Sequence, residues 1–130
     1  MTNRISANAV TFTNDGYSTL LGFAEDPANP QRYVMLNLTN DPDEQDFALG
    51  MTGVHIEAGD LKVDGYDLVT DLSLTQGSLI ITLDSDAARA AGIDPEIEIV
   101  VKDEAIDGVP LAEAVDVFRE RIAARPPTRP

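Results

Sequence analysis

Turn-forming residues recur along this chain, and short runs rich in β-branched and aromatic residues lie between them. The strongest of these signals is Asp15-Gly16, because Asp-Gly between two such runs is typical of a tight β-hairpin. Further turn signals stand at residues 26–30, 58–60 and 75–78. Turns spaced in this way predict about seven or eight strands arranged mainly as an antiparallel meander.

The runs between the turns differ in how far they should be buried. Residues 4–12 alternate loosely and form the first predicted strand. Residues 32–39 carry apolar side chains on both faces, which indicates a strand in the centre of its sheet. Residues 47–57 form a predicted strand interrupted by glycines. In residues 96–101 apolar and polar side chains alternate, which is the pattern of a half-buried strand.

Two helices complete the predicted fold. Residues 84–86 are a good N-cap cluster for a short helix that ends at Gly92. Farther on, an apolar stripe at helical spacing follows Pro110, and its members are Leu111, Val115, Phe118 and Ile122. We therefore expect an α+β fold, with a mostly antiparallel meander sheet, one short helix and a C-terminal helix packed on one face. The sequence leaves open whether the strands on either side of the short helix pair in parallel or antiparallel.

The length of 130 residues suits one domain with one core. We place that domain at residues 1–124 and expect residues 125–130 to form a flexible Pro-rich tail. The N-terminal residues lack the apolar stretch of a secretion signal, and no run is long and apolar enough to span a membrane. The expected location is therefore the cytoplasm.

The net charge of −14 is confined to the middle of the chain. Residues 40–107 hold 17 acidic and three basic residues, whereas the remaining segments are balanced. Such a charge excludes nucleic acid binding through a basic face, because phosphate would be repelled. It is compatible with two hypotheses: a solvated surface that serves solubility, or a surface that meets a basic protein partner.

Motifs that carry chemistry are sparse. Cysteine is absent, and His55 is the only histidine, within a strand pattern and without a Gly-x-Ser-x-Gly element to present a serine. The segment from Asp41 resembles the start of a calcium loop, but its sixth and twelfth positions carry the wrong residues. No glycine-rich phosphate loop is present. We therefore predict no catalytic residue, no metal and no cofactor.

If the acidic surface binds a protein, its densest segment is the best candidate contact. Four carboxylates stand within residues 41–46, and Tyr66 lies between two more as a possible aromatic anchor. The predicted partner-binding residues are Asp41, Asp43, Glu44, Asp46, Asp64, Tyr66 and Asp67.

An ordered set of short segments resembles the bacterial immunity protein 10 family over roughly residues 5–122. The opening of that family is similar to residues 17–26 and 33–36, and its middle is similar to residues 43–51 and 54–57. The similarity continues at residues 65–66, 72–74, 79–84 and 87–88. The stretch 102–112 and the basic Pro-rich tail depart from the pattern.

The resemblance implies a cytosolic immunity protein of a polymorphic-toxin or contact-dependent-inhibition system, which binds and blocks a cognate secreted toxin domain. It implies no catalytic residue, and it is compatible with a monomer or a homodimer. The acidic surface would suit a basic toxin, for example a nuclease. Two alternatives remain open: a small acidic enzyme that uses a carboxylate pair, and a dimeric secretion chaperone or structural subunit.

Overall fold

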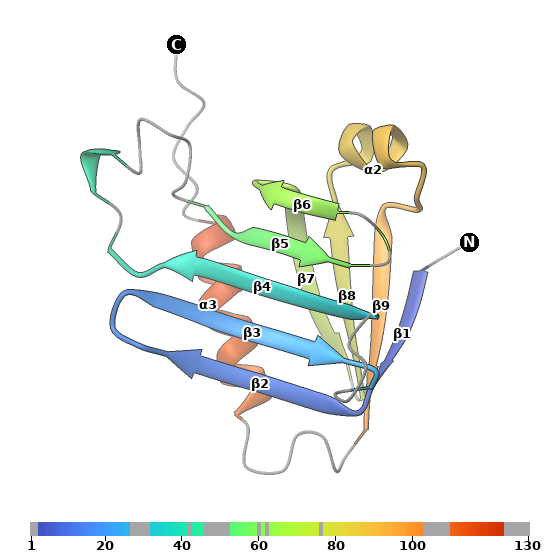
Figure 1. The fold of residues 1–130 in the computed structure, drawn as a ribbon, viewed down its shortest axis with the longest axis horizontal. Helices are drawn as coiled ribbons and strands as arrows, with labels where there is room; N and C mark the ends of the chain where they lie inside the picture. The colour runs from blue at the N-terminus through green and yellow to red at the C-terminus, as the bar shows by residue number, and fades with distance from the viewer. Residues whose placement is uncertain are drawn as a thin grey trace.

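The computed structural model describes residues 3–26, 32–41, 43–45, 53–59, 61, 63–75, 77–102 and 110–123, and in these segments the strands form two sheets. The five-stranded sheet runs in the order β2 (Ala9–Asn14), β3 (Ser18–Ala24), β4 (Tyr33–Thr39), β5 (His55–Ala58) and β6 (Val63–Tyr66). The four-stranded sheet runs in the order β1 (Asn3–Ala7), β9 (Glu96–Val101), β8 (Ser78–Leu83) and β7 (Val69–Thr75). Figure 1 shows the two sheets crossing at a steep angle.

The predicted α+β class is confirmed, but the prediction of one meander sheet of about seven or eight strands is wrong. The strands β2 to β6 do pair antiparallel in chain order, and so do β7, β8 and β9. The exception is β1, which pairs in parallel with β9 from the other end of the sequence. Because that pairing joins Ile5 to Ile99, no local pattern signals it. The strands on either side of the short helix, β8 and β9, pair antiparallel.

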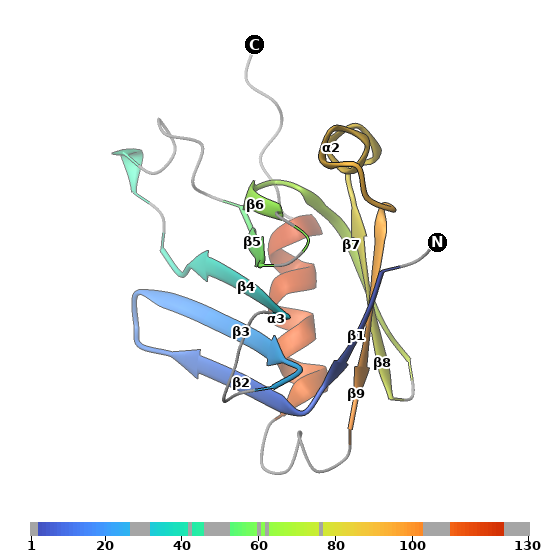
Figure 2. The same cartoon turned by 45° about the vertical axis from the view of Figure 1, so that its right-hand side comes forward.

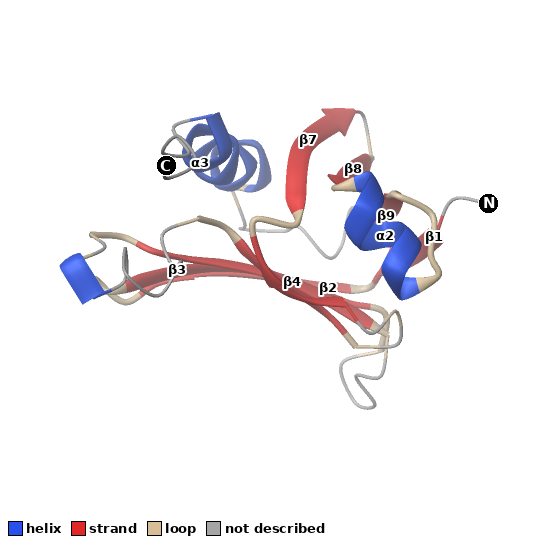
Figure 3. Ribbon diagram, turned by 90° about the horizontal axis from the view of Figure 1, so that it is seen from above, coloured by secondary structure: helices blue, strands red, loops and turns tan. Residues whose placement is uncertain are grey.

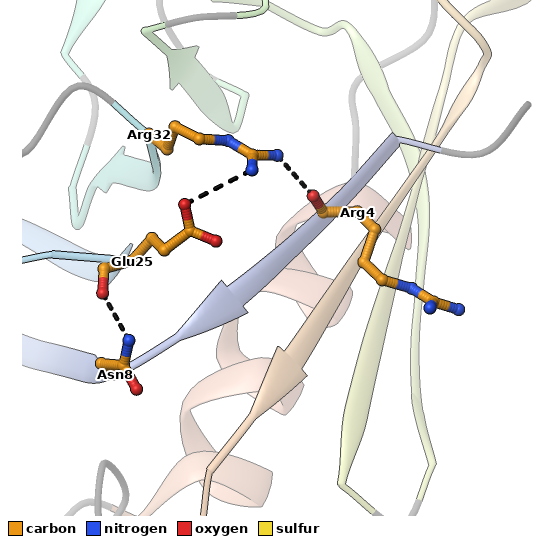
Figure 4. A network of polar contacts seen from close by, with 4 residues as sticks. All are labelled: Arg4, Asn8, Glu25 and Arg32. Atoms are coloured by element: carbon orange, nitrogen blue, oxygen red, sulfur yellow. Dashed lines mark hydrogen bonds and ion pairs between the residues drawn. The ribbon is translucent and has the colours of Figure 1, made fainter.

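The chain crosses from one sheet to the other twice, first at Asn8, between β1 and β2, and again between β6 and β7. Residues 4–12 are therefore two strands in different sheets rather than one. A polar network holds this crossing (Figure 4). The Arg32 guanidinium donates to the carbonyl oxygen of Arg4 at 2.6 Å and lies 3.3 Å from a Glu25 carboxylate oxygen. The Asn8 side chain donates to the carbonyl oxygen of Glu25 at 2.6 Å. These contacts tie the end of β3 and the start of β4 to β1.

The hairpin predicted at Asp15-Gly16 joins β2 to β3. Gly16 has a φ of 92°, a backbone conformation that glycine adopts without strain. The Asp15 carboxylate accepts hydrogen bonds from the backbone N–H groups of Tyr17 and Ser18, both at 2.9 Å. These bonds favour the ionised form, so the pKa of Asp15 is lowered, the bond from Ser18 being the largest cause.

The predicted helices are confirmed as α2 (Ser85–Ala91) and α3 (Leu111–Ala123). The Asp84 side chain caps α2 by accepting from the N–H of Ala87 at 3.0 Å, and Gly92 ends the helix with a φ of 74°. Within the described segments, no helix is both long enough and apolar enough to cross a bilayer.

The apolar stripe of α3 faces the core, where Leu111, Val115 and Phe118 are buried and Ile122 is partly buried. Figure 2 shows α3 standing between the five-stranded sheet and β7. At its end, the Arg121 guanidinium donates to the carbonyl oxygens of Thr39 at 2.8 Å and Asn40 at 3.1 Å. The helix is thereby fixed to the end of β4 as well as to the core.

The predicted central strand at residues 32–39 is β4, which has two strands on each side. The predicted strand at 47–57 is described only from residue 53, and its last part forms β5. The predicted tail at 125–130 lies outside the described residues.

Candidate functional site

The five-stranded sheet has one face on the core and one face that the described parts of the chain leave uncovered. Side chains alternate between the two faces of a strand, and those of Leu21, Val34 and Ile56 are fully buried. Figure 3 shows α3 and the four-stranded sheet on the same side of this sheet. We call the opposite side the outer face; its residues are Ala9, Thr11, Thr13, Ser18, Leu20, Gly22, Ala24, Tyr33, Met35, Asn37, Thr39, His55, Glu57, Asp64 and Tyr66.

One half of the outer face, on β4, β5 and β6, is polar and contains two carboxylates side by side. Glu57 and Asp64 are directly paired across β5 and β6. The Tyr33 hydroxyl donates a hydrogen bond to Glu57, and a ring nitrogen of His55 lies 2.8 Å from an oxygen of Asp64. Each carboxylate therefore has a different side chain that orients it.

The aromatic groups around these carboxylates are packed rather than free. The His55 and Tyr66 rings meet edge to face with their centroids 4.9 Å apart, and the Asn37 amide lies 3.4 Å from the other nitrogen of His55. The pKa of Tyr33 is raised, first by its hydrogen bond to the Glu57 carboxylate, then by burial and by the charges of Glu57 and Asp64. Tyr33 thus stays neutral beside the two acids.

The other half of the outer face, on β2, β3 and β4, is apolar and hollowed. The hollow has a volume of about 460 Å³, and its lining is mainly small or aliphatic: Ala9, Thr11, Leu20, Gly22, Phe23, Ala24, Tyr33 and Met35. Gly22 lies at its floor, where the side chains of Leu20 and Met35 come nearest. The hollow exists because three neighbouring positions on β2 and β3 carry no side chain larger than a methyl group.

The structure brings together only part of the predicted contact set. Asp64 and Tyr66 lie on the outer face, on the same strand. Asp67 is the next residue and forms the corner where the chain leaves β6 for β7, with a φ of 61°. The residues that follow β4, namely Asp41, Asp43 and Glu44, are exposed, and Asp46 lies outside the described residues.

The exposed acids Asp41, Asp43 and Glu44 nevertheless follow β4 near the end of the five-stranded sheet where β6 leads into Asp67. Because β4 and β6 are both antiparallel to β5, which lies between them, they run in the same direction. Their C-terminal ends therefore lie at the same end of the sheet. The segment with Asp41 and Glu44 extends from that end of the sheet, beyond the arrowhead of β4 (Figure 1). It does not lie on the outer face itself.

The sequence-based prediction missed four outer-face residues, namely Tyr33, Asn37, His55 and Glu57. Their signal was present in the alternation of residues 33–39 and 54–57, which places these side chains on the opposite face from Val34 and Leu36. What the alternation does not give is the register that sets Asn37 beside His55 and Glu57 beside Asp64.

A second hollow, of about 500 Å³, lies between β7 and α3 and is lined by acids and a base, among them Asp71, Asp116, Arg119 and Glu120. Within the described segments no three metal-ligating side chains come close enough to hold an ion. This groove is therefore a weaker candidate than the outer face, which combines aromatic, acidic and apolar groups.

The family comparison agrees with the resemblance seen in the sequence. The sequence model of the family described as Immunity protein 10 matches residues 6–107. The matched range contains every residue of the outer face and ends before α3. No curated protein matches the chain.

Proposed function

The chain belongs to the immunity protein 10 family, and from this premise we propose that it binds and neutralises a cognate toxin domain secreted by bacteria. The observation that carries the proposal is the family match over residues 6–107. The cytoplasm is the expected site of action, in a polymorphic-toxin or contact-dependent-inhibition system. The protein acts as a binding partner, as a monomer or a homodimer, and not as an enzyme.

The charge of the chain supports a basic toxin as the partner. All of the net charge of −14 comes from residues 40–107. A one-signed surface speeds the encounter with a partner of opposite charge and disfavours partners of like charge. A toxin that acts on nucleic acid needs a basic cleft and would fit this charge.

We propose that the acids at one end of the five-stranded sheet make the first contact. Asp41, Asp43 and Glu44 follow β4 at that end of the sheet, and Asp46 comes after them in the sequence. Asp64 and Tyr66 lie on β6, the last strand of the sheet, and Asp67 directly follows it. Tyr66 is packed against His55, so it presents a rigid aromatic edge of the kind that is enriched in binding hot spots.

The test first looks beside the gene of this chain for a large secreted protein with a variable C-terminal domain. It then measures association with that candidate toxin domain by stopped-flow kinetics at several salt concentrations. Reversing Asp43, Glu44 and Asp46 to lysine should slow association by about tenfold or more at low salt and flatten its salt dependence. The matched control reverses Glu113, Asp116 and Glu120 on α3, which changes the net charge by the same amount at another place.

If both triple variants slow association equally, total charge acts and the segment after β4 is not the contact. If the unaltered chain neither binds this toxin nor protects cells that produce it, the proposed function itself is wrong.

A further inference from the structure

One row of side chains crosses the whole outer face at right angles to the strands. The strand register aligns Thr11, Gly22, Met35, Glu57 and Asp64 on neighbouring strands, from β2 to β6. The row begins in the apolar hollow and ends at the carboxylate pair. Since adjacent strands lie about 4.8 Å apart, Gly22 and Glu57 are about 10 Å from each other.

The apolar end of the row is a hollow that is large enough to accept a side chain of a partner. A Cβ atom added at Gly22 would lie 3.6 Å from the side chains of Leu20 and Met35, in ordinary contact, and so would begin to fill the hollow without a clash. The volume of about 460 Å³ can accept a large apolar side chain. An apolar hollow on an open sheet face is a typical mark of a protein-binding surface.

The acidic end of the row has capacity for a cation. Glu57 and Asp64 each accept one hydrogen bond from a neighbouring side chain, and an ionised carboxylate can accept several. Among the outer-face residues that the structure describes, none is a lysine or an arginine. A partner arginine could engage both carboxylates, because its guanidinium presents several donors in a fixed plane.

We infer that the outer face of the five-stranded sheet is the docking surface for the toxin, which inserts an apolar side chain at Gly22 and places an arginine or lysine against Glu57 and Asp64. The inference rests on the proposed function and names the chemistry of the partner's contact segment. Charge complementarity selects this partner, since a basic toxin offers cations and a second acidic copy of this chain would be repelled.

Two substitutions test the role of the hollow, one at its floor and one at its exposed edge. Gly22→Val adds a β-branched side chain on the floor of the hollow within a strand, and Thr11→Arg adds a long charged side chain at its exposed edge. Both variants should weaken binding to the toxin by about tenfold or more, chiefly through faster dissociation. The matched controls are Ser73→Val and Ser73→Arg, at an exposed position on β7 of the other sheet, and they should bind within about twofold of the unaltered chain.

The acidic end is tested separately with Glu57→Gln and Asp64→Asn, which preserve shape and remove charge. Each should weaken binding by several fold at low salt and by less at high salt. Thermal unfolding shows which variants fold, and Thr11→Arg decides the case if Gly22→Val does not fold, because Thr11 is exposed.

Toxin binding by the unaltered chain together with unchanged binding by Thr11→Arg and by a folded Gly22→Val would overturn the docking surface and leave the proposed function standing. Absence of binding by the unaltered chain would instead overturn the proposed function.

Discussion

Asp67 shows at the scale of one residue how the chain turns from one sheet into the other. Its backbone φ of 61° is unusual for a residue other than glycine, and aspartate is one of the few side chains that tolerate it. Its N–H donates to the carbonyl oxygen of Val54 at 3.1 Å. Its carboxylate fills the space above Gly53, where an added Cβ would come within 2.1 Å of a carboxylate oxygen. The corner therefore depends on the absence of a side chain at Gly53.

Gly53→Ala should lower the free energy of unfolding by about 1–3 kcal/mol, because the new methyl group displaces the Asp67 side chain. Urea denaturation measures the change. Asp67→Gly removes the carboxylate and suits the left-handed backbone, so the double variant should recover much of the loss. Simple additivity of the two single changes would show that Gly53 and Asp67 are not coupled.

Tyr33 provides a prediction about proton binding. Its pKa is raised, first by the hydrogen bond to Glu57, so the folded state holds the phenol proton at pH values where the unfolded chain has lost it. The folded state then binds more protons than the unfolded state, and the stability that Tyr33 contributes is present below about pH 10 and falls as the pH rises further. Absorbance titration should show a tyrosine that ionises above the ordinary range of a phenol.

Two variants assign that late titration. Tyr33→Phe should remove it, and Glu57→Gln should move it toward the ordinary range, because the charge that opposes ionisation is gone. If the late step survives Tyr33→Phe, it belongs to another tyrosine and the hydrogen bond to Glu57 does not control the titration.

Among the secondary-structure elements, α3 packs on the core through one apolar stripe, and substitutions in it measure how much this packing stabilises the fold. Phe118 is fully buried in the stripe, whereas its neighbour Val117 is 38% exposed. Phe118→Ala should cost about 3–5 kcal/mol of unfolding free energy, since it removes buried surface and leaves a cavity. Val117→Ala, on the same turn of the same helix, should change it by no more than about 0.5 kcal/mol. Similar losses from both changes would mean that α3 does not pack by its predicted stripe.

The elements that sequence predicts well are those defined by neighbours along the chain. The Asp15-Gly16 hairpin, the Asp84 cap with Gly92 and the stripe of α3 follow from local hydrogen bonds and side-chain periodicity. The division into two sheets does not, because it depends on Ile5 meeting Ile99 and on a crossing at Asn8 that has no marked local signal.

The same limit applies to the candidate site. Asp64 and Tyr66 belong to one strand, so spacing alone brings them to one face. Their partners His55 and Glu57 belong to another strand, and only the pairing of β5 with β6 sets them in place. A one-residue change of register would turn these side chains toward the core, so the site is a product of the sheet rather than of a motif.

For the whole molecule, the net charge of −14 should act in opposite directions on folding and on the proposed binding of a basic toxin. Within the folded chain most of these charges repel one another, and the ion pairs of the described residues, such as Arg4 with Glu98 at 2.8 Å, are mainly on the surface and contribute little. Raising the salt from about 10 mM to 150 mM shortens the screening length from about 30 Å to about 8 Å. Screening should therefore stabilise the fold and slow the association with a basic toxin.

The urea midpoint of the free chain should thus rise with sodium chloride over this range, while the association rate with the toxin falls. Choline chloride at the same ionic strength should have the same effect if screening is the cause rather than binding of a particular ion. The triple lysine variant at Asp43, Glu44 and Asp46 reduces the net negative charge by six, so its midpoint should respond less to salt. A urea midpoint that falls with added salt would show that attractive ion pairs outweigh the repulsion. The acidic residues would then serve the stability of the fold rather than the binding of a basic partner.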